Sequence, residues 1–137
     1  MNIVKFPTPS LLEKSIEIEL NEENLAFIEE LKEFYKSLTG TAVGIAAPQV
    51  GKNIRVFIAQ GGVYINPIIH KKSKETYKAW EGCLSIPKQL YRVERHKDID
   101  FEWTDADGVK HKENIDGFRA EVIQHEYDHL EGVLINQ

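Results

Sequence analysis

The chain has 137 residues, of which 42% are hydrophobic and 28% charged, and a formal net charge of −5 at pH 7. This length suits one domain with its own core, so we expect a single domain over residues 1–137. The negative charge disfavours nucleic acid and anionic membranes as partners. No apolar run approaches the ~20 residues that span a bilayer, and the N-terminus resembles no signal or transit peptide, which predicts a cytoplasmic protein.

An N-terminal surface helix is predicted for residues 22–38. Asn21 is a typical N-cap, and two glutamates follow it in the first turn of the helix. Apolar residues then recur at helical spacing until Gly40, where a helix would end. One apolar stripe with a charged opposite face indicates a structural role.

The middle of the chain changes to short runs rich in β-branched and aromatic residues, which predict strands. These runs are residues 54–59, 63–69, 76–80, 91–95, 98–104 and 109–114. The last two flank Asp105-Ala106-Asp107-Gly108, a hairpin turn signal. A second helix is predicted from about Asp116 to Glu131, ending at Gly132. Strands gathered between two helices, without regular alternation, indicate an α+β fold.

The second helix carries His125-Glu126-Tyr127-Asp128-His129, an HExxH pattern. Four residues make just over one helical turn, so both imidazoles project from one face and can converge on one metal ion. Glu126 is rotated by roughly 100° from His125, so its carboxylate lies beside the ion and can accept a proton from bound water. A pair of core histidines is the alternative, but burying both without a metal would be unfavourable.

The only cysteine of the chain, Cys83, excludes an intrachain disulfide. It lies in Trp80-Glu81-Gly82-Cys83-Leu84-Ser85-Ile86-Pro87, which we place between strands. Catalytic metal sites typically use three protein ligands, and a Cys83 thiolate would complete a Cys-His-His set with an open position for water. The alternative is a buried, unreactive thiol, which is the commoner state of a lone cysteine.

A third segment, Gly44-Ile45-Ala46-Ala47-Pro48-Gln49, combines a glycine and small residues with an amide side chain. Such a segment can approach a ligand backbone closely. Considered alone, the pattern is more often a packed turn.

Together and in this order, the segments resemble the peptide deformylase family. The family motifs read Gly-x-Gly-x-Ala-Ala-x-Gln, Glu-Gly-Cys-Leu-Ser and Gln-His-Glu-x-Asp-His-Leu-x-Gly. Residues 81–85 and 124–132 match the second and third motifs without change, whereas the first departs at its opening glycine, which is Ala42 here. The segment Phe6-Pro7-Thr8-Pro9-Ser10-Leu11-Leu12 is also similar to the opening of the family, so the resemblance covers nearly the whole chain.

The resemblance implies antiparallel sheets packed around a central helix that carries both histidines. It implies one divalent ion held by Cys83, His125 and His129, natively Fe²⁺, for which Zn²⁺, Ni²⁺ or Co²⁺ can substitute. The implied reaction removes the N-formyl group from N-terminal formylmethionine of nascent polypeptides and releases formate. Metal-bound water attacks the formyl carbon, with Glu126 as general base and then general acid.

The resemblance also assigns residues that contact the substrate. The Gln49 side-chain amide and the backbone N–H of Leu84 are implied as donors to the oxyanion. Residues implied to line the channel for an extended peptide are Val43, Gly44 and Gly82.

Two residues one and two turns before His125, Val122 and Phe118, are candidates for the methionine pocket, with ordinary core packing as the alternative. Metal ligands usually need supporting groups, for which we expect Glu81 and Asp128, with Arg95 as a buried partner for one of these acids. The remaining histidines lack ligand spacing and are expected at the surface: His70, His96 and His111.

Three features depart from the family pattern. Ala42 adds a methyl group that would lower substrate affinity if this position needs close contact. Lys88 follows Pro87 in place of a small residue and predicts an altered rim. The sequence ends five residues after Gly132, like the short forms that some phages encode, whereas many members continue into a further helix.

The ribosome is a further candidate partner.

Two other functions are alternatives at this point. A small HExxH peptidase would use another histidine or glutamate as third ligand, and Cys83 would be dispensable. A catalytically silent relative would only bind metal or peptide, but retention of the three ligand residues, Glu126 and Gln49 argues against it.

Overall fold

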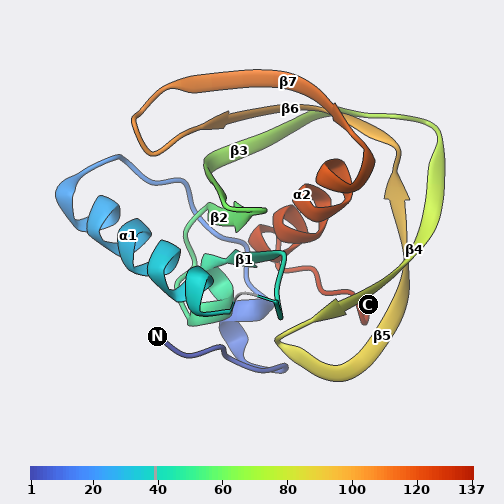
Figure 1. The fold of residues 1–137 in the computed structure, drawn as a ribbon, viewed down its shortest axis with the longest axis horizontal. Helices are drawn as coiled ribbons and strands as arrows, with labels where there is room; N and C mark the ends of the chain where they lie inside the picture. The colour runs from blue at the N-terminus through green and yellow to red at the C-terminus, as the bar shows by residue number, and fades with distance from the viewer. Residues whose placement is uncertain (39) are drawn as a thin grey trace.

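Helix α2 (Gly117–Leu130) lies at the centre of the structure, a computed structural model that describes residues 1–38 and 40–137 (Figure 1). A five-stranded antiparallel sheet of order β1-β2-β3-β6-β7 packs on one side of it, and the two-stranded hairpin β4–β5 packs on another. The strands of the large sheet are β1 (Gly44–Ala46), β2 (Val56–Ala59), β3 (Gly62–Lys72), β6 (Asp98–Thr104) and β7 (Lys110–Asp116). The hairpin strands are β4 (Thr76–Cys83) and β5 (Ile86–His96). The predicted α+β fold, with antiparallel sheets around a central helix, is confirmed.

Helix α1 (Glu22–Ser37) covers the outside of the sheet near β1 and β2 (Figure 1). It begins as predicted, because the Asn21 side chain accepts a hydrogen bond of 2.8 Å from the backbone N–H of Asn24. Its apolar stripe buries Ile28 and Leu31 against side chains of β1 and β2. The predicted surface helix is therefore confirmed.

The side of α2 that faces the large sheet is apolar. Ala120, Ile123 and Leu130 are fully buried there against a group of aromatic rings: Phe57, Tyr64, Phe101 and Trp103. Neighbouring rings in this group have centroids 5.1 to 6.4 Å apart, within the range of favourable aromatic pairs. Each large apolar side chain buried in this way contributes roughly 1.5–3 kcal/mol, so the sheet holds the helix firmly from one side.

The other side of α2, which carries Phe118, Val122, His125 and His129, is buried only in part. Phe118 is 55% exposed, whereas Val122 and His129 are buried. Phe118 belongs to the first turn of the helix and lines a cleft that is open to solvent. The face with the histidines lies toward the hairpin, and the buried apolar stripe runs along the sheet instead.

The strand predictions were too short in the hairpin. We placed residues 80–87 between strands, but β4 continues through Glu81 to Cys83, and β5 begins at Ile86. Glu81 pairs with Tyr91, and a bulge then precedes the pairing of Cys83 with Ile86. Glycine and charged residues have low strand propensity, so the local sequence pattern does not predict a strand here. Pairing between β4 and β5 nevertheless extends both strands. Strand β1 and two short 3₁₀ helices, Pro9–Leu11 and Ala47–Val50, were not predicted.

Two polar side chains tie α2 to its surroundings. Arg55 lies just before β2, and its Nη1 donates to the backbone oxygens of Ser15 and Leu130, at 3.2 Å each, and to Glu131 Oε2 at 2.8 Å. It thereby neutralises the C-terminal end of the helix. The Gln124 side-chain amide bonds both backbone groups of His96, each at 2.9 Å, and so attaches α2 to the end of β5.

Substitution Arg55→Met is expected to lower the free energy of unfolding by about 2–3 kcal/mol, because buried carbonyls and the Glu131 carboxylate lose their charged donor. Urea unfolding measures this difference. The matched control is Lys14→Met, which removes a well-exposed cation 4.0 Å from the same glutamate and should have little effect. Equal losses in both variants would contradict a capping role for Arg55.

Candidate active site

Cys83 meets the two histidines of α2 at the junction of the hairpin and the helix. Its Sγ lies 3.4 Å from His129 Nε2, and the ligand atoms of Cys83, His125 and His129 all lie within 4.8 Å of one another. The two imidazole rings have centroids 5.2 Å apart, as expected for positions one turn apart. Within residues 1–38 and 40–137, no other three His, Cys, Asp or Glu side chains come together in this way.

These side chains fit a divalent ion. A thiolate and two imidazoles are ligands that Zn²⁺ and Fe²⁺ accept, and three ligands leave a position for water or substrate. His125 Nδ1 bonds to Glu81 Oε1 at 2.8 Å, so its Nε2 is the ring nitrogen left for a metal. His129 directs Nε2 toward the sulfur, while its buried Nδ1 has no hydrogen-bond partner among the described residues. The structure thus contains a possible metal site.

An ion-pair network supports the site from the hairpin side. Arg95 is buried and donates to both carboxylate oxygens of Glu81, at 2.8 and 2.7 Å, and to Asp128 Oδ2 at 2.7 Å. Burial raises the pKa of Glu81, but the hydrogen bonds from Arg95 and His125 outweigh it and bring the pKa to about 2. Arg95 is therefore buried and paired as predicted, with both acids rather than one, and Glu81 fixes the orientation of His125.

The histidines differ in their preference for a proton. Burial disfavours the charged form of His125, but hydrogen bonds to Cys83 and Glu81 prevail and raise its pKa to about 10. Burial and the neighbouring charge of His125 hold the pKa of His129 well below its usual value. Because an imidazole ligates a metal only when neutral, metal binding must displace the proton of His125.

Glu126 lies buried at the floor of the site. Burial, the largest cause, raises its pKa to about 7, although the positive charge of His125 opposes this shift. Its Oε1 has no hydrogen-bond partner among the described residues. Its Oε2 packs on the backbone of Gly44, where an added Cβ would lie only 2.6 Å from that oxygen. The glycine therefore makes room for the carboxylate, a role that we did not predict.

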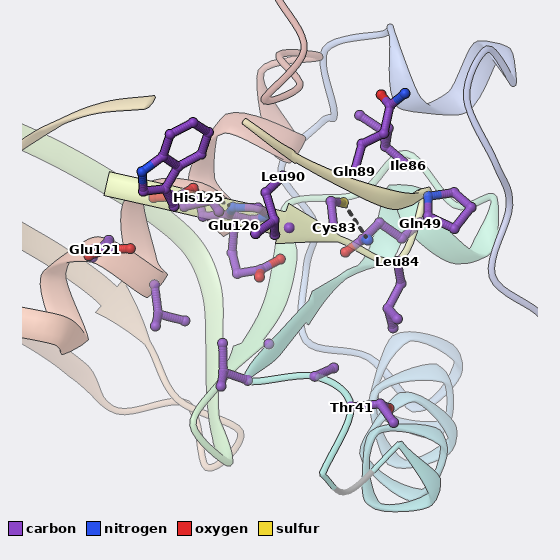
Figure 2. Close-up of a pocket in the computed structure, with 18 of the residues that line it drawn as sticks. Thr41, Gln49, Cys83, Leu84, Ile86, Gln89, Leu90, Glu121, His125 and Glu126 are labelled. Atoms are coloured by element: carbon purple, nitrogen blue, oxygen red, sulfur yellow. Dashed lines mark hydrogen bonds and ion pairs between the residues drawn. The ribbon is translucent and has the colours of Figure 1, made fainter. Parts of the chain in front are cut away.

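Gln49 is buried and has a fixed orientation. Its Oε1 accepts a hydrogen bond of 3.0 Å from the Ala46 backbone N–H. The amide nitrogen consequently faces the site, where it lies 3.5 Å from Cys83 Sγ (Figure 2) and 3.3 Å from Ser85 Oγ. Leu84 follows Cys83 in the turn between β4 and β5, and Figure 2 shows its side chain directed away from the sulfur.

The N-terminal segment joins the two parts of the chain that carry these groups, and sequence reasoning missed it. The Val4 N–H donates to the backbone oxygen of Gln49 at 2.8 Å, and the Phe6 N–H donates to that of Ser85 at 2.9 Å. Lys5 Nζ donates to the backbone oxygen of Leu84 at 3.1 Å. No local pattern signals such contacts, although Ser85 itself belongs to a matched motif.

A cleft with a volume of about 900 Å³ opens over the site. The predicted substrate-contacting residues all line it: Val43, Gly44, Gly82, Phe118 and Val122. Ala42 and Lys88, which depart from the family pattern, also line the cleft, as do Trp80 and Leu90, which we did not predict. The other histidines lie outside it, and none of them is buried. His70 is exposed, whereas His96 and His111 are partly exposed and bond the Ser73 backbone oxygen and Asp105 Oδ2, each at 2.7 Å.

A family model described as "Polypeptide deformylase" matches residues 1–137. The chain belongs to this family. A peptide deformylase of Pseudothermotoga lettingae is 40% identical over 130 residues, which cover 92% of this chain and 75% of that one. The activity of this chain is therefore the known activity of the family. The enzyme removes the N-formyl group from formylmethionine at the N-terminus of nascent polypeptides in a metal-dependent reaction that releases formate.

Solved structures agree with the fold. The crystal structure of peptide deformylase from Thermotoga maritima has a TM-score of 0.91 at 37% identity and covers 98% of this chain and 94% of that chain. A probable peptide deformylase from Synechococcus phage S-SSM7 has a TM-score of 0.90 at 36% identity, with coverage of 99% and 97%. The predicted resemblance to the family, including phage members, is confirmed. Neither α-helix in the described part of the chain is both long and apolar enough to cross a membrane.

Substitution Gly44→Ala is expected to lower kcat by about 100-fold with unchanged metal content, because the added methyl group would lie 2.6 Å from Glu126 Oε2 and 2.8 Å from the Ile58 backbone oxygen and so displaces the carboxylate. Steady-state kinetics and metal analysis measure both quantities. The control Gly62→Ala adds the same methyl group to a strand glycine outside the cleft, where the nearest atom lies 3.3 Å away. A Gly44→Ala enzyme with normal kcat would contradict the packing role.

Substitution Glu81→Gln is expected to weaken metal affinity about 10- to 100-fold, because His125 loses its carboxylate acceptor and Arg95 loses its counter-charge. Competition with a chromophoric chelator for Co²⁺ or Zn²⁺ measures the affinity. Glu94→Gln changes an exposed glutamate of the same hairpin and serves as the control. Equal affinities in the two variants would show that Glu81 does not support the ligand.

Proposed function

We propose that residues 1–137 form one catalytic domain in which Cys83, His125 and His129 hold a single divalent ion. The observation that carries this proposal is the convergence of one sulfur and two imidazoles within 4.8 Å at the floor of a cleft. The peptidase alternative needed another histidine or glutamate as third ligand. No such side chain among the described residues joins the two histidines in a cluster of three, which favours Cys83.

The proposed native ion is Fe²⁺, with Zn²⁺, Ni²⁺ or Co²⁺ able to replace it. A thiolate with two imidazoles suits each of these borderline ions. When bound, such an ion acts as a Lewis acid that lowers the pKa of a coordinated water and polarises the substrate carbonyl. An Fe²⁺–thiolate site fits a reducing compartment, so we place the enzyme in the cytoplasm of a bacterium, or of the host cell of a phage.

Glu126 is the proposed general base and acid. It accepts a proton from the attacking water, whose oxygen then bonds to the formyl carbon. As the carbon–nitrogen bond breaks, Glu126 returns this proton to the departing amine, so the products are formate and a free N-terminal methionine. Its burial next to His125, with one carboxylate oxygen unpartnered among the described residues, supports this role.

The Gln49 side-chain amide and the backbone N–H of Leu84 are the proposed donors to the developing oxyanion. Support comes from the orientation of Gln49, because Ala46 holds its oxygen and leaves the amide nitrogen facing Cys83. Leu84 adjoins Cys83 in the chain and lines the same cleft. Donors held in this way need no rearrangement as charge develops.

The substrate is proposed to lie extended between β1 and β4. Both are edge strands, so their outer backbone groups can pair with a peptide at Val43, Gly44 and Gly82. The methionine side chain would then enter the cleft wall formed by Phe118 and Val122 of α2. Nascent chains carry this substrate, so we propose that the enzyme acts at the ribosome, with neither a membrane nor free nucleic acid as a partner.

Anaerobically purified protein is expected to release formate from a formyl-Met peptide, whereas Glu126→Ala should retain its metal and lose at least about 100-fold in kcat. An enzyme-coupled formate assay and metal analysis test this together. The control Glu113→Ala removes an exposed carboxylate on β7 that pairs with Arg119. Equal rates in native and Glu126→Ala protein would remove Glu126 from the mechanism.

A further inference from the structure

Large apolar side chains lie exposed around the cleft. Val43, Trp80, Leu90 and Phe118 line it with exposed fractions of 51%, 65%, 65% and 55%. Exposed apolar groups gathered at one place usually mark a binding surface. Val43 and Phe118 already belong to the proposed substrate contacts, whereas Trp80 and Leu90 have no role in the reaction.

Trp80 and Leu90 lie on the outer face of the hairpin. Trp80 of β4 pairs with Arg92 of β5, and side chains alternate along a strand, so Gly82 and Leu90 are on the same face. The opposite face carries buried Glu81 and lies toward α2. The outer face is therefore an apolar surface beside the catalytic centre rather than part of the core.

Arg92 contacts the Trp80 ring, and Gly82 leaves room for the Leu90 side chain. The Arg92 guanidinium lies 5.9 Å from the centre of the Trp80 ring, a cation–π contact. Leu90 leans over Gly82, where an added Cβ would lie 3.2 Å from Leu90 Cδ2. Figure 2 shows Leu90 directed into the cleft. Without a side chain at Gly82, the surface between the two residues stays open to a peptide.

We propose that Trp80 and Leu90 form an apolar shelf that binds the side chain of the second residue of the substrate, and so favours large apolar residues after formylmethionine. This rests on the proposed function, in which the extended peptide pairs with β4. Successive side chains of that peptide point to opposite faces. If methionine points inward to Val122, the next side chain points outward, onto the shelf.

Two peptides that differ only at this residue, formyl-Met-Leu-Ser and formyl-Met-Ser-Ser, test the proposal. Native enzyme is expected to show about five-fold higher kcat/KM for the leucine peptide, mainly through a lower KM. The reason is that a partly exposed apolar surface provides only part of the discrimination between side chains that a closed apolar pocket provides. In Trp80→Ala and Leu90→Ala, this ratio should fall toward one. The control Val109→Ala removes an equally exposed apolar side chain, 52% exposed, outside the cleft and should leave the ratio unchanged.

A native ratio of one, or a ratio that survives both substitutions, overturns the shelf. If neither peptide were hydrolysed, the proposed function would fail separately, and the shelf would be judged on the product peptides Met-Leu-Ser and Met-Ser-Ser. Their Kd values can be read from tryptophan emission, because Trp80 is exposed and the other tryptophan, Trp103, is buried. Five-fold tighter binding of the leucine peptide supports the shelf, and equal Kd values overturn it.

Discussion

The carboxylate of Glu81 connects the hairpin to the helix, and the arrangement of the site depends on it. One carboxylate receives two hydrogen bonds from Arg95, at 2.8 and 2.7 Å, and one from His125 Nδ1 at 2.8 Å. Ionised groups this deeply buried are tolerated only when each is paired. The position of Cys83, two residues along the same strand, relative to the histidines therefore follows from this one shared acceptor.

Contacts elsewhere in the fold keep α2 next to the Glu81 carboxylate. On its sheet side, α2 buries apolar residues among stacked aromatic rings, while Arg55 and Gln124 tie it to β2 and β5. The same helix must bury His129, Gln124 and Glu126 on its other side, which an isolated amphipathic helix would not do. The apolar contacts thus stabilise a helix whose other side carries the polar residues of the site. Because Gly44 has no side chain, Glu126 fits beside the histidines.

The sequence predicts those parts of the site that depend on local spacing of residues. Helical periodicity and the HExxH pattern predict both α-helices and the converging imidazoles, and the need for a third ligand indicates Cys83. It failed where contacts are long-range, as with the hydrogen bonds of Val4 to Gln49 and of Phe6 to Ser85, since no periodic pattern encodes them. Strand β1 is too short to show alternation, and the exposure of Phe118 depends on the cleft beside the helix, which the pattern of the helix itself does not reveal.

The central claim is that one ion is bound by a sulfur from the hairpin and two imidazoles from the helix. X-ray absorption at the metal edge of protein loaded with Zn²⁺ tests it directly, because sulfur and nitrogen shells separate by distance. The expected spectrum has one sulfur at about 2.3 Å and two imidazole nitrogens at about 2.0–2.1 Å, with a remaining light-atom ligand. A first shell that contains only nitrogen and oxygen would contradict the account.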